Sequence, residues 1–358
     1  MPIASPAVPA PSLPRWARRA ITVPAALAAP WVLAGAAPLA VPVVLARDLV
    51  DGDGRLWRTR AYAMALAYAV AESAGVTASA GLWIAAGRQG TETDRSRMWH
   101  HTLQRAWVAS ILAAARTLLG LRFEVEGLDR RDDRPLIVLG RHASLPDAFL
   151  PADLFVVRSN RLLRMVVKDD LEWVPCLDIV GHRLPNAFVD RTPSDGAEAV
   201  AALARVIDGM GGRDVAVIFP EGTYPSTTAR ERAHARLAER SPEHVERARA
   251  LRHLLPPRPA GTLALLDAVP DADVAILGHV GLEELSSMRR LARSLPLRHP
   301  VRARLWRIPR SEVPVDREGR IEWLWRRWEM LDDWVDAEVG ARQAREPQEP
   351  PEPREAVA

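Results

Sequence analysis

A long stretch without charge near the N-terminus limits what this chain of 358 residues can fold into more than any other feature. Residues 20–46 contain no charged side chain, and a second apolar run, residues 61–87, is broken only by Glu72. The first run exceeds the roughly 20 residues that cross a bilayer as a helix. It also exceeds the apolar part of a cleaved signal peptide, about 7–15 residues. The two runs therefore predict a pair of hydrophobic helices that stays with the protein.

Prolines and arginines in and around these runs bear on how they could sit in a membrane. A kinked or re-entrant segment fits the first run as well as a straight span does, because four prolines interrupt it: Pro24, Pro30, Pro38 and Pro42. Arginines precede, separate and follow the runs, so the one-sided positive charge that orients membrane helices is missing. A hairpin that dips into one leaflet fits this symmetry, and the alternative is a pair of buried helices in a soluble protein. We expect membrane association, with the active site facing the cytoplasm.

Composition excludes several classes of protein. Hydrophobic residues make up 48% of the chain and charged residues 26%, which is ordinary for a globular protein and excludes a wholly disordered or multi-span membrane chain. Cys176 is the only cysteine, so neither an intrachain disulfide framework nor a cysteine-based zinc site is possible. Lys168 is the only lysine among 48 basic residues, and no block of basic residues suggests a nucleic-acid partner.

Four segments differ in composition and predict the domain organisation. Residues 1–19 are rich in Pro and Ala and then basic, which predicts a disordered basic leader. Residues 20–97 hold the membrane-associating hydrophobic hairpin. Residues 98–340 have the mixed composition of a folded domain. Residues 341–358 are rich in Pro and Glu and are expected to be a disordered tail.

Short apolar runs alternate with helical patterns in the folded domain. The runs predict strands over residues 123–125, 136–139, 215–219 and 274–277, and helical spacing predicts helices over 197–207 and 229–251. This alternation predicts an α/β fold with a mostly parallel sheet flanked by helices. Near the end of the domain, apolar residues from Ile321 to Val335 repeat on one face of a helix. Core packing accounts for that stripe better than contact with a membrane.

The first candidate for chemistry is the pair His142 and Asp147, which follows a predicted strand. In a continuous helix these residues would lie about 140° apart, but at a turn from strand to helix they can meet. Ser144 and Asp147 match a capping box and Pro146 suits a first helical turn, so a helix is predicted to begin near Leu145. A carboxylate on one imidazole nitrogen leaves the other free to accept a proton from a substrate hydroxyl. The alternative is a capping aspartate beside a structural histidine.

Two further segments could bind a substrate. The turn Phe219–Thr223 follows a predicted strand and brings the Glu221 carboxylate to the carboxyl edge of the sheet, where open α/β sheets bind ligands. Glu221 could orient a hydroxyl group there. Arg191 follows another short apolar segment and could hold a phosphate through two hydrogen bonds. The alternative for Phe219–Thr223 is an ordinary turn at the end of a strand, and Arg191 taken alone is better explained as a solvated arginine at a turn.

Three blocks in this order resemble the glycerolipid acyltransferase family, of the 1-acylglycerol-3-phosphate acyltransferase and lysophospholipid acyltransferase type with an H-x4-D motif. They are His142–Asp147, Phe188–Arg191 and Phe219–Thr223. Two other segments are also similar to family blocks: Lys168–Leu171 with Pro175, and residues 253–261. The resemblance covers roughly residues 98–340, which would be the acyltransferase domain, and it implies a glycerol-3-phosphate acyltransferase-like fold.

The resemblance implies a role for each matching residue. His142 would be the general base on the acceptor hydroxyl and Asp147 would orient it. The acceptor site would be formed by Arg191, Lys168, Glu221, Gly222 and Thr223, with Arg141 as a nearby phosphate-seeking side chain. The donor would be acyl-CoA or acyl carrier protein, and the acceptor a lysophospholipid in the membrane. No metal or bound cofactor is required.

The sequence departs from the family pattern at three places. Pro185 stands where Gly is usual, Tyr224 where Arg is frequent, and Arg141 where Asn is usual. The acceptor could therefore be other than simple lysophosphatidic acid: a lysophospholipid with a larger head group or another hydroxylated lipid. Two alternatives stay open: a transacylase that moves acyl groups between phospholipids without CoA, and a catalytically silent lipid-binding scaffold. A hydrolase that uses the same pair with water is disfavoured, since nothing indicates a covalent nucleophile.

Overall fold

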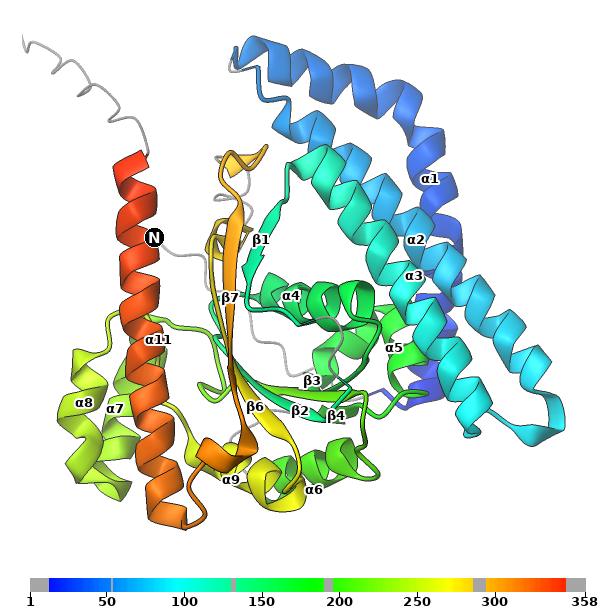
Figure 1. Cartoon of the computed structure of the whole chain (residues 1–358). Coiled ribbons are helices and arrows are strands. Elements are labelled where there is room, and N and C mark those ends of the chain that lie inside the picture. Colours follow the sequence, from blue (N-terminus) through cyan, green and yellow to red (C-terminus); the bar gives the residue numbers. More distant parts are fainter. Residues whose placement is uncertain (1–12, 53, 130–132, 190–195, 286–293, 346–358) are drawn as a thin grey trace, which may run out of the picture.

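The computed structural model describes residues 13–52, 54–129, 133–189, 196–285 and 294–345. Three long helices lie along one side of a sheet domain: α1 (Arg15–Val50), α2 (Trp57–Ala86) and α3 (Asp94–Leu119) (Figure 1). The helix α1 is visibly bent in Figure 1, and all four prolines of the first apolar run lie inside it. Each proline removes one backbone hydrogen bond of the helix. The first apolar run, for which the sequence allows a straight or a kinked helix, therefore forms a kinked one.

The start of α1 corrects the predicted leader. The helix begins at Arg15, so the boundary of the disordered segment at residue 19 is wrong. Pro14 precedes the first turn, where its missing N–H costs no hydrogen bond, and no helix breaker separates Arg15 from the apolar run. Residues 1–12 of the predicted leader lie outside the described residues.

A seven-stranded sheet forms the centre of the domain, in the order β1-β7-β6-β2-β5-β3-β4. The strands are β1 (Phe123–Glu126), β2 (Leu136–Gly140), β3 (Leu162–Lys168), β4 (Ala187–Val189), β5 (Asp214–Ile218), β6 (Asp273–Val280) and β7 (Val301–Ile308). All pairings are parallel except the one between β6 and β7. The predicted fold class, a mostly parallel sheet flanked by helices with an N-terminal pair of apolar helices, is confirmed.

Helices cover both faces of the sheet. In the described part of the chain they are α4 (Phe149–Pro151), between the 3₁₀-helix η2 (Leu145–Ala148) and the π-helix η3 (Ala152–Arg158), α5 (Pro175–Gly181), α6 (Gly196–Ile207), α7 (Thr227–Arg240), α8 (Val245–Ala250), α9 (Pro259–Ala268) and α11 (Arg317–Arg345). Alternate residues of β2 point to opposite faces. Leu136 and Val138 join a core with α3 and η3, whereas Ile137 and Leu139 join a second core with α9 and α11.

Two helices differ from the predicted spans. The helix predicted over 229–251 is two helices, α7 and α8, because Pro242 follows Ser241 and cannot continue the hydrogen bonding of α7. The helix α11 continues to Arg345, so the predicted tail begins later than residue 341. The apolar stripe of α11 packs against the sheet, and Trp325 and Trp328 are at most 1% exposed. Core packing is therefore the correct explanation of that stripe.

Candidate active site

The carboxyl ends of five parallel strands meet at one edge of the sheet. Leu139 of β2 pairs with Ile218 of β5, and Gly140 pairs with Leu277 of β6. The segments that follow β2 and β5 therefore begin side by side. This register brings His142 and Glu221, which are far apart in the sequence, into contact: the His142 backbone N–H donates to Oε1 of Glu221 at 2.7 Å.

Asp147 lies at the start of the helical segment that follows β2, as predicted. Ser144 and Asp147 form a capping box, with Pro146 in the first turn. Oδ2 of Asp147 accepts the backbone N–H groups of Ala143 and Ser144 and lies 3.4 Å from Nδ1 of His142. Oδ1 accepts the Ser144 hydroxyl at 2.7 Å. The carboxylate is thus held rigidly beside the imidazole.

The surroundings of Asp147 keep it ionised. Burial acts to raise its pKa, but the charge of His279 and the hydrogen bonds from His142 and Ser144 outweigh it, so the pKa of Asp147 lies below its usual value. His279 is 1% exposed, and its Nε2 lies 3.6 Å from Oδ1 of Asp147. Sequence reasoning missed this histidine. The rule that selected His142, a histidine beside a predicted strand, would also have found His279 after the run 274–277.

Aromatic rings enclose the His142 imidazole. The ring stacks on Phe219, with 4.3 Å between centroids and 19° between planes. Tyr224 packs against it at the same centroid distance, tilted by 54°. The His142 residue is 7% exposed and Tyr224 is 38% exposed, so Tyr224 borders the solvent side of the site. Tyr224, one of the three departures from the family pattern, therefore packs directly against the candidate base.

Glu221 lies beneath the site, which differs from the prediction that it contacts the acceptor. Its two oxygens accept the backbone N–H groups of His142 and Leu255, at 2.7 and 2.9 Å, and the residue is 1% exposed. Burial raises the pKa of Glu221 to about 8, although both backbone donors and Arg141 act to lower it. The carboxyl group joins the loop after β2 to the segment around Leu255 and supports the backbone of His142.

Arg141 is also placed differently from the prediction. Its guanidinium donates to the backbone carbonyl of His279 and to the carboxylate of Glu283, and the residue is 4% exposed. Burial and these two partners leave no surface for a phosphate. The sequence shows that residue 141 is an arginine. It does not show that a carbonyl oxygen of β6 and a carboxylate of η6 (Leu282–Leu285) lie within reach of its guanidinium.

Three of the remaining predicted residues, Gly222, Thr223 and Lys168, lie around the same edge. Gly222 has a φ of +72°, and the guanidinium of Arg258 packs where a β-carbon would stand. Thr223 is partly buried. Lys168 ends β3, has a half-exposed side chain and pairs with Asp170. Arg191 lies outside the described residues. Val189, at the end of β4, is the last described residue before Arg191, and it pairs with Lys168.

An apolar cavity of about 450 Å³ begins beside Asp147. Pro146 and Phe149, close to Asp147 in the sequence, line it, and so do Met64 and Tyr68 of α2. The other lining residues are Ala61, Ala65, Ile111, Leu112, Ala115, Leu119, Leu121, Phe123, Leu282, Leu285 and Leu295. No charged side chain is among them. A cavity of this chemistry fits a hydrocarbon chain.

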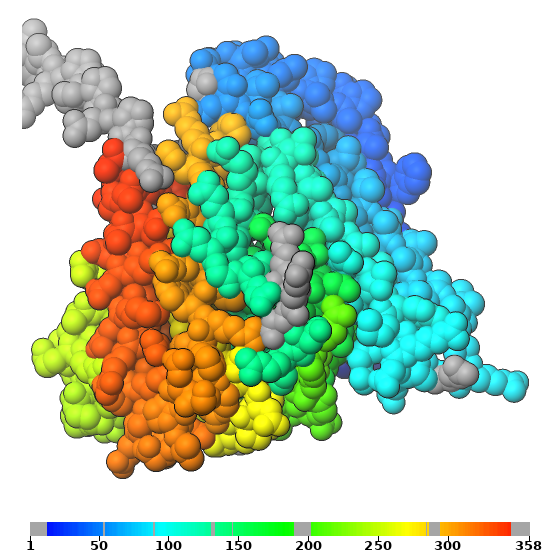
Figure 2. Space-filling view, viewed as in Figure 1, coloured from blue at the N-terminus to red at the C-terminus, as the bar shows by residue number. Residues whose placement is uncertain are grey.

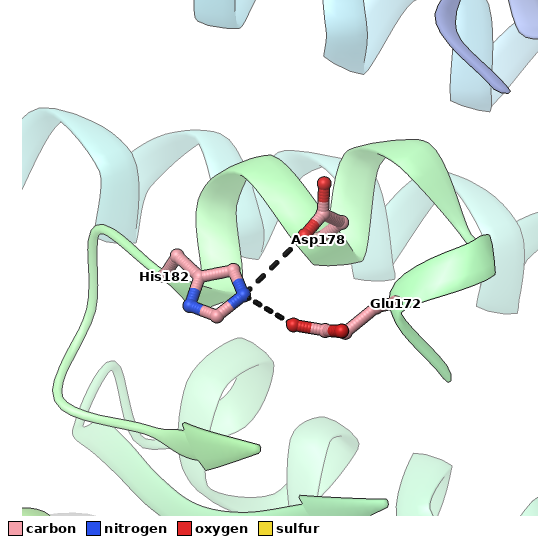
Figure 3. Close-up of side chains that lie close together, drawn as sticks. All are labelled: Glu172, Asp178 and His182. Carbon is pink, nitrogen blue, oxygen red and sulfur yellow. Dashed lines mark hydrogen bonds and ion pairs between the residues drawn. The ribbon is translucent and has the colours of Figure 1, made fainter. Parts of the chain in front are cut away.

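A second cluster of titratable side chains lies away from this edge, between α1 and α5. Nε2 of His182 is 2.6 Å from Glu172 and 3.3 Å from Asp178 (Figure 3). Arg18 contacts both carboxylates, and Arg19 contacts Asp178 at 2.6 Å. Two guanidinium groups already neutralise the carboxylates and would repel a cation. The cluster is therefore an ion-pair junction between α1 and α5.

Comparison with known proteins supports the family resemblance. Residues 122–256 match the family model named Acyltransferase. A comparison with curated proteins gives no match. Among solved structures, the chain is similar to the 1-acyl-sn-glycerophosphate (LPA) acyltransferase PlsC of Thermotoga maritima, at 15% identity and a TM-score of 0.43, over 68% of this chain and 82% of that one. A similarity this weak carries no argument, so the assignment depends on the family match and on the sequence blocks inside it. On these grounds residues 122–256 form an acyltransferase domain, and its sequence blocks resemble those of glycerolipid acyltransferases.

Proposed function

We propose that this protein transfers a fatty acyl group from an acyl thioester, acyl-CoA or acyl carrier protein, to the free hydroxyl of a lysophospholipid such as 1-acylglycerol-3-phosphate. The observation that carries the proposal is a base beside a hydrocarbon pocket. His142 is oriented by Asp147, and the helical turn that holds Asp147 also forms one wall of the apolar cavity. An acyl chain in the cavity would present its thioester carbon near the imidazole.

The chemistry follows from the orientation of the ring. With Nδ1 directed at Asp147, Nε2 is the nitrogen that accepts the proton of the acceptor hydroxyl. The hydroxyl oxygen attacks the thioester carbon, and the C–S bond breaks. The proton held by His142 passes to the departing sulfur. The products are the acylated lipid and a free thiol. Such acid–base assistance contributes roughly 10²- to 10⁴-fold to a rate.

The acceptor phosphate is proposed to bind at Lys168 and Arg191. Lys168 ends a strand at the active edge with its side chain half exposed, which suits a ligand that arrives from outside. Gly222 and Thr223 are proposed to border the acceptor. Arg141 has no part in this proposal, because its guanidinium is buried against Glu283 and His279. The proposed reaction requires neither a metal nor a bound cofactor.

The N-terminal helices are proposed to associate with the membrane that holds the acceptor. Two helices, α1 and α2, are long and apolar enough to cross a bilayer by length and composition. None of the most apolar window of α1 is buried, and Trp31 and Leu39 are each about 80% exposed. Figure 2 shows α1 and α2 as one flank of the molecule, on the side away from α11. Exposed apolar surface of this extent is typical of membrane contact. We propose that the active site faces the cytoplasm, where acyl thioesters are available.

A thiol-release assay in liposomes tests the proposal. One acyl-CoA is offered with a panel of lysophospholipids, and CoA release is followed with and without each acceptor. Acceptor-dependent release is the expected result. Acylation from a phospholipid donor with no thioester present would instead show a transacylase. Absence of transfer from either donor, with acyl carrier protein also tried, would favour the silent scaffold.

A further inference from the structure

Asp147 contacts a second imidazole that the proposed mechanism does not use. His142 approaches Oδ2 of the carboxylate, from the loop after β2. Nε2 of His279, in β6, lies 3.6 Å from the other oxygen, Oδ1. Both histidine residues are more than nine-tenths buried. The orienting carboxylate therefore lies between two histidine rings that come from neighbouring strands.

Two reciprocal hydrogen bonds fix the position of His279. Its Nε2 lies 3.2 Å from the carbonyl oxygen of Arg141, and because a carbonyl can only accept, Nε2 carries the hydrogen. The guanidinium of Arg141 donates in return to the backbone carbonyl of His279. These bonds join the ends of β2 and β6 at the residue before His142. The ring of His279 is thus tied to the backbone of the base as well as to Asp147.

Packing alone does not explain a histidine at this position. Nδ1 of His279 is buried and has no hydrogen-bond partner among the described residues. A buried nitrogen without a partner costs about 1–3 kcal/mol, and an apolar side chain of similar size would avoid this cost. What distinguishes His279 from a histidine that only fills space is its other nitrogen, which contacts Asp147 and the carbonyl of Arg141.

We propose that His279 is a positioning residue for acyl transfer. Its Nε2–H hydrogen bond to the Arg141 carbonyl and its charge contact with Asp147 keep the backbone before His142 and the carboxylate in the geometry that the base needs. The inference rests on the proposed function, because that function makes His142 the base. His279 itself does not touch the substrate. It acts through Asp147 and through the carbonyl of Arg141.

Removing His279 changes the charge balance of the site. The charged and titratable groups that face it and Asp147 are Arg141 and His142 after β2, Glu221 after β5 and Glu283 on η6. His279 acts to lower the pKa of Asp147. Without it, the carboxylate attracts a proton more strongly, so the His142–Asp147 pair titrates at a higher pH. The acid limb of the activity profile moves with that pair.

The test compares His279→Leu with His279→Gln. Leucine removes the N–H group, whereas the glutamine amide can place an N–H near the position of Nε2. We expect His279→Leu to lower kcat by about tenfold with little change in KM, since misplaced catalytic groups reduce turnover. The acid limb of the profile should move to higher pH. His279→Gln should recover most of kcat but not the pH profile, because the amide restores the N–H group and carries no charge.

A matched control is His101→Leu. His101 is equally buried, has one hydrogen bond from Nε2, to Asn160, and also has an Nδ1 without a partner among the described residues. It lies on α3 and takes no part in the proposed reaction. Equal effects of the two leucine variants on kcat, or an unchanged pH profile in His279→Leu, would overturn the proposal.

Titration of His142 by NMR separates this inference from the function. Its apparent pKa should rise in His279→Leu even if the wild-type protein transfers no acyl group in the assay. An unchanged titration of His142 in His279→Leu would overturn the positioning role. Absence of acyl transfer in the wild-type protein would instead overturn the proposed function alone.

Discussion

Glu221 supports the backbone of His142 from below, and its buried carboxyl group makes the stability of the site depend on pH. Its pKa is about 8 in the folded protein against 4.5 for an ordinary glutamate, so the folded state holds a proton that the unfolded state releases between these values. The stability from this group is therefore present below about pH 4.5 and is lost as the pH rises through 8. Glu221→Gln cannot titrate, and it loses about 1–3 kcal/mol because its amide nitrogen cannot accept the second backbone N–H.

The melting temperatures of the wild-type protein and Glu221→Gln, measured from pH 5 to pH 9, check this prediction. The advantage of the wild type should shrink as the pH rises. A constant difference across the range would contradict the shifted pKa.

Gly222 needs both its backbone conformation and its missing side chain. At a φ of +72° any other residue is strained, and a β-carbon would lie 2.9 Å from Nη1 of Arg258. Gly222→Ala should therefore cost more than the roughly 1 kcal/mol of the backbone strain alone. Gly209→Ala is the matched control, because Gly209 has a φ of +59° with nothing within 4 Å of the added carbon. Equal losses in thermal unfolding would show that the contact with Arg258 contributes nothing.

At the scale of single residues, the sequence predicts contacts between side chains that are close along the chain, and it does not predict contacts between side chains that are far apart. His142 and Asp147 lie only five positions apart, and the capping box of Ser144 and Asp147 predicts a turn between them that lets the two side chains meet. The partners of Arg141, His279 and Glu283, lie about 140 residues further along the chain. Only the register between β2 and β6 brings them together, and no spacing in the sequence contains that register.

Among the elements, the junction of α1 with α5 connects the N-terminal apolar helices to the domain. Asp178 is fully buried and contacts Arg18 and Arg19. Burial acts to raise the pKa of Asp178, but His182 and the two arginines outweigh it and hold the pKa well below its usual range. Its contribution to stability is therefore present at neutral pH and is lost only in strong acid.

Asp178→Asn should destabilise the protein by about 3 kcal/mol, because the buried Arg18 loses one of its two carboxylate partners and Arg19 also loses Asp178. Asp94→Asn is the control, since Asp94 forms an exposed pair with Arg97 and should cost less than about 0.5 kcal/mol. Chemical unfolding measures both losses. A loss for Asp178→Asn as small as that of the control would show that the junction does not hold α1 in place.

Elements with a clean hydrophobic pattern were predicted, and elements with buried charges were not. The strands β2, β5 and β6 were found from their apolar runs. The strand β3 was missed because it carries Arg164, whose buried guanidinium pairs with Asp214 and with carbonyl groups after α6. A buried arginine looks like a surface residue until its partners are known.

For the molecule as a whole, the proposed function predicts that the apolar cavity limits the length of the acyl chain. Ala65 lines the cavity from an exposed position on α2, so a larger side chain there fills the cavity without disturbing the core. Ala65→Phe should shift kcat/KM toward shorter acyl-CoA donors. Ala74→Phe, at an exposed position of α2 that does not line the cavity, should leave the preference unchanged. Identical chain-length profiles for wild type and Ala65→Phe would place the acyl chain elsewhere.

The role of His142 as the base is the central claim, and one comparison tests it most directly. Acceptor-dependent thiol release is measured for the wild-type protein and for His142→Ala in liposomes, with unfolding followed in parallel. We predict that the substitution lowers kcat by roughly 10²-fold or more while the protein stays folded. Thiol release at the wild-type rate by folded His142→Ala would contradict the account.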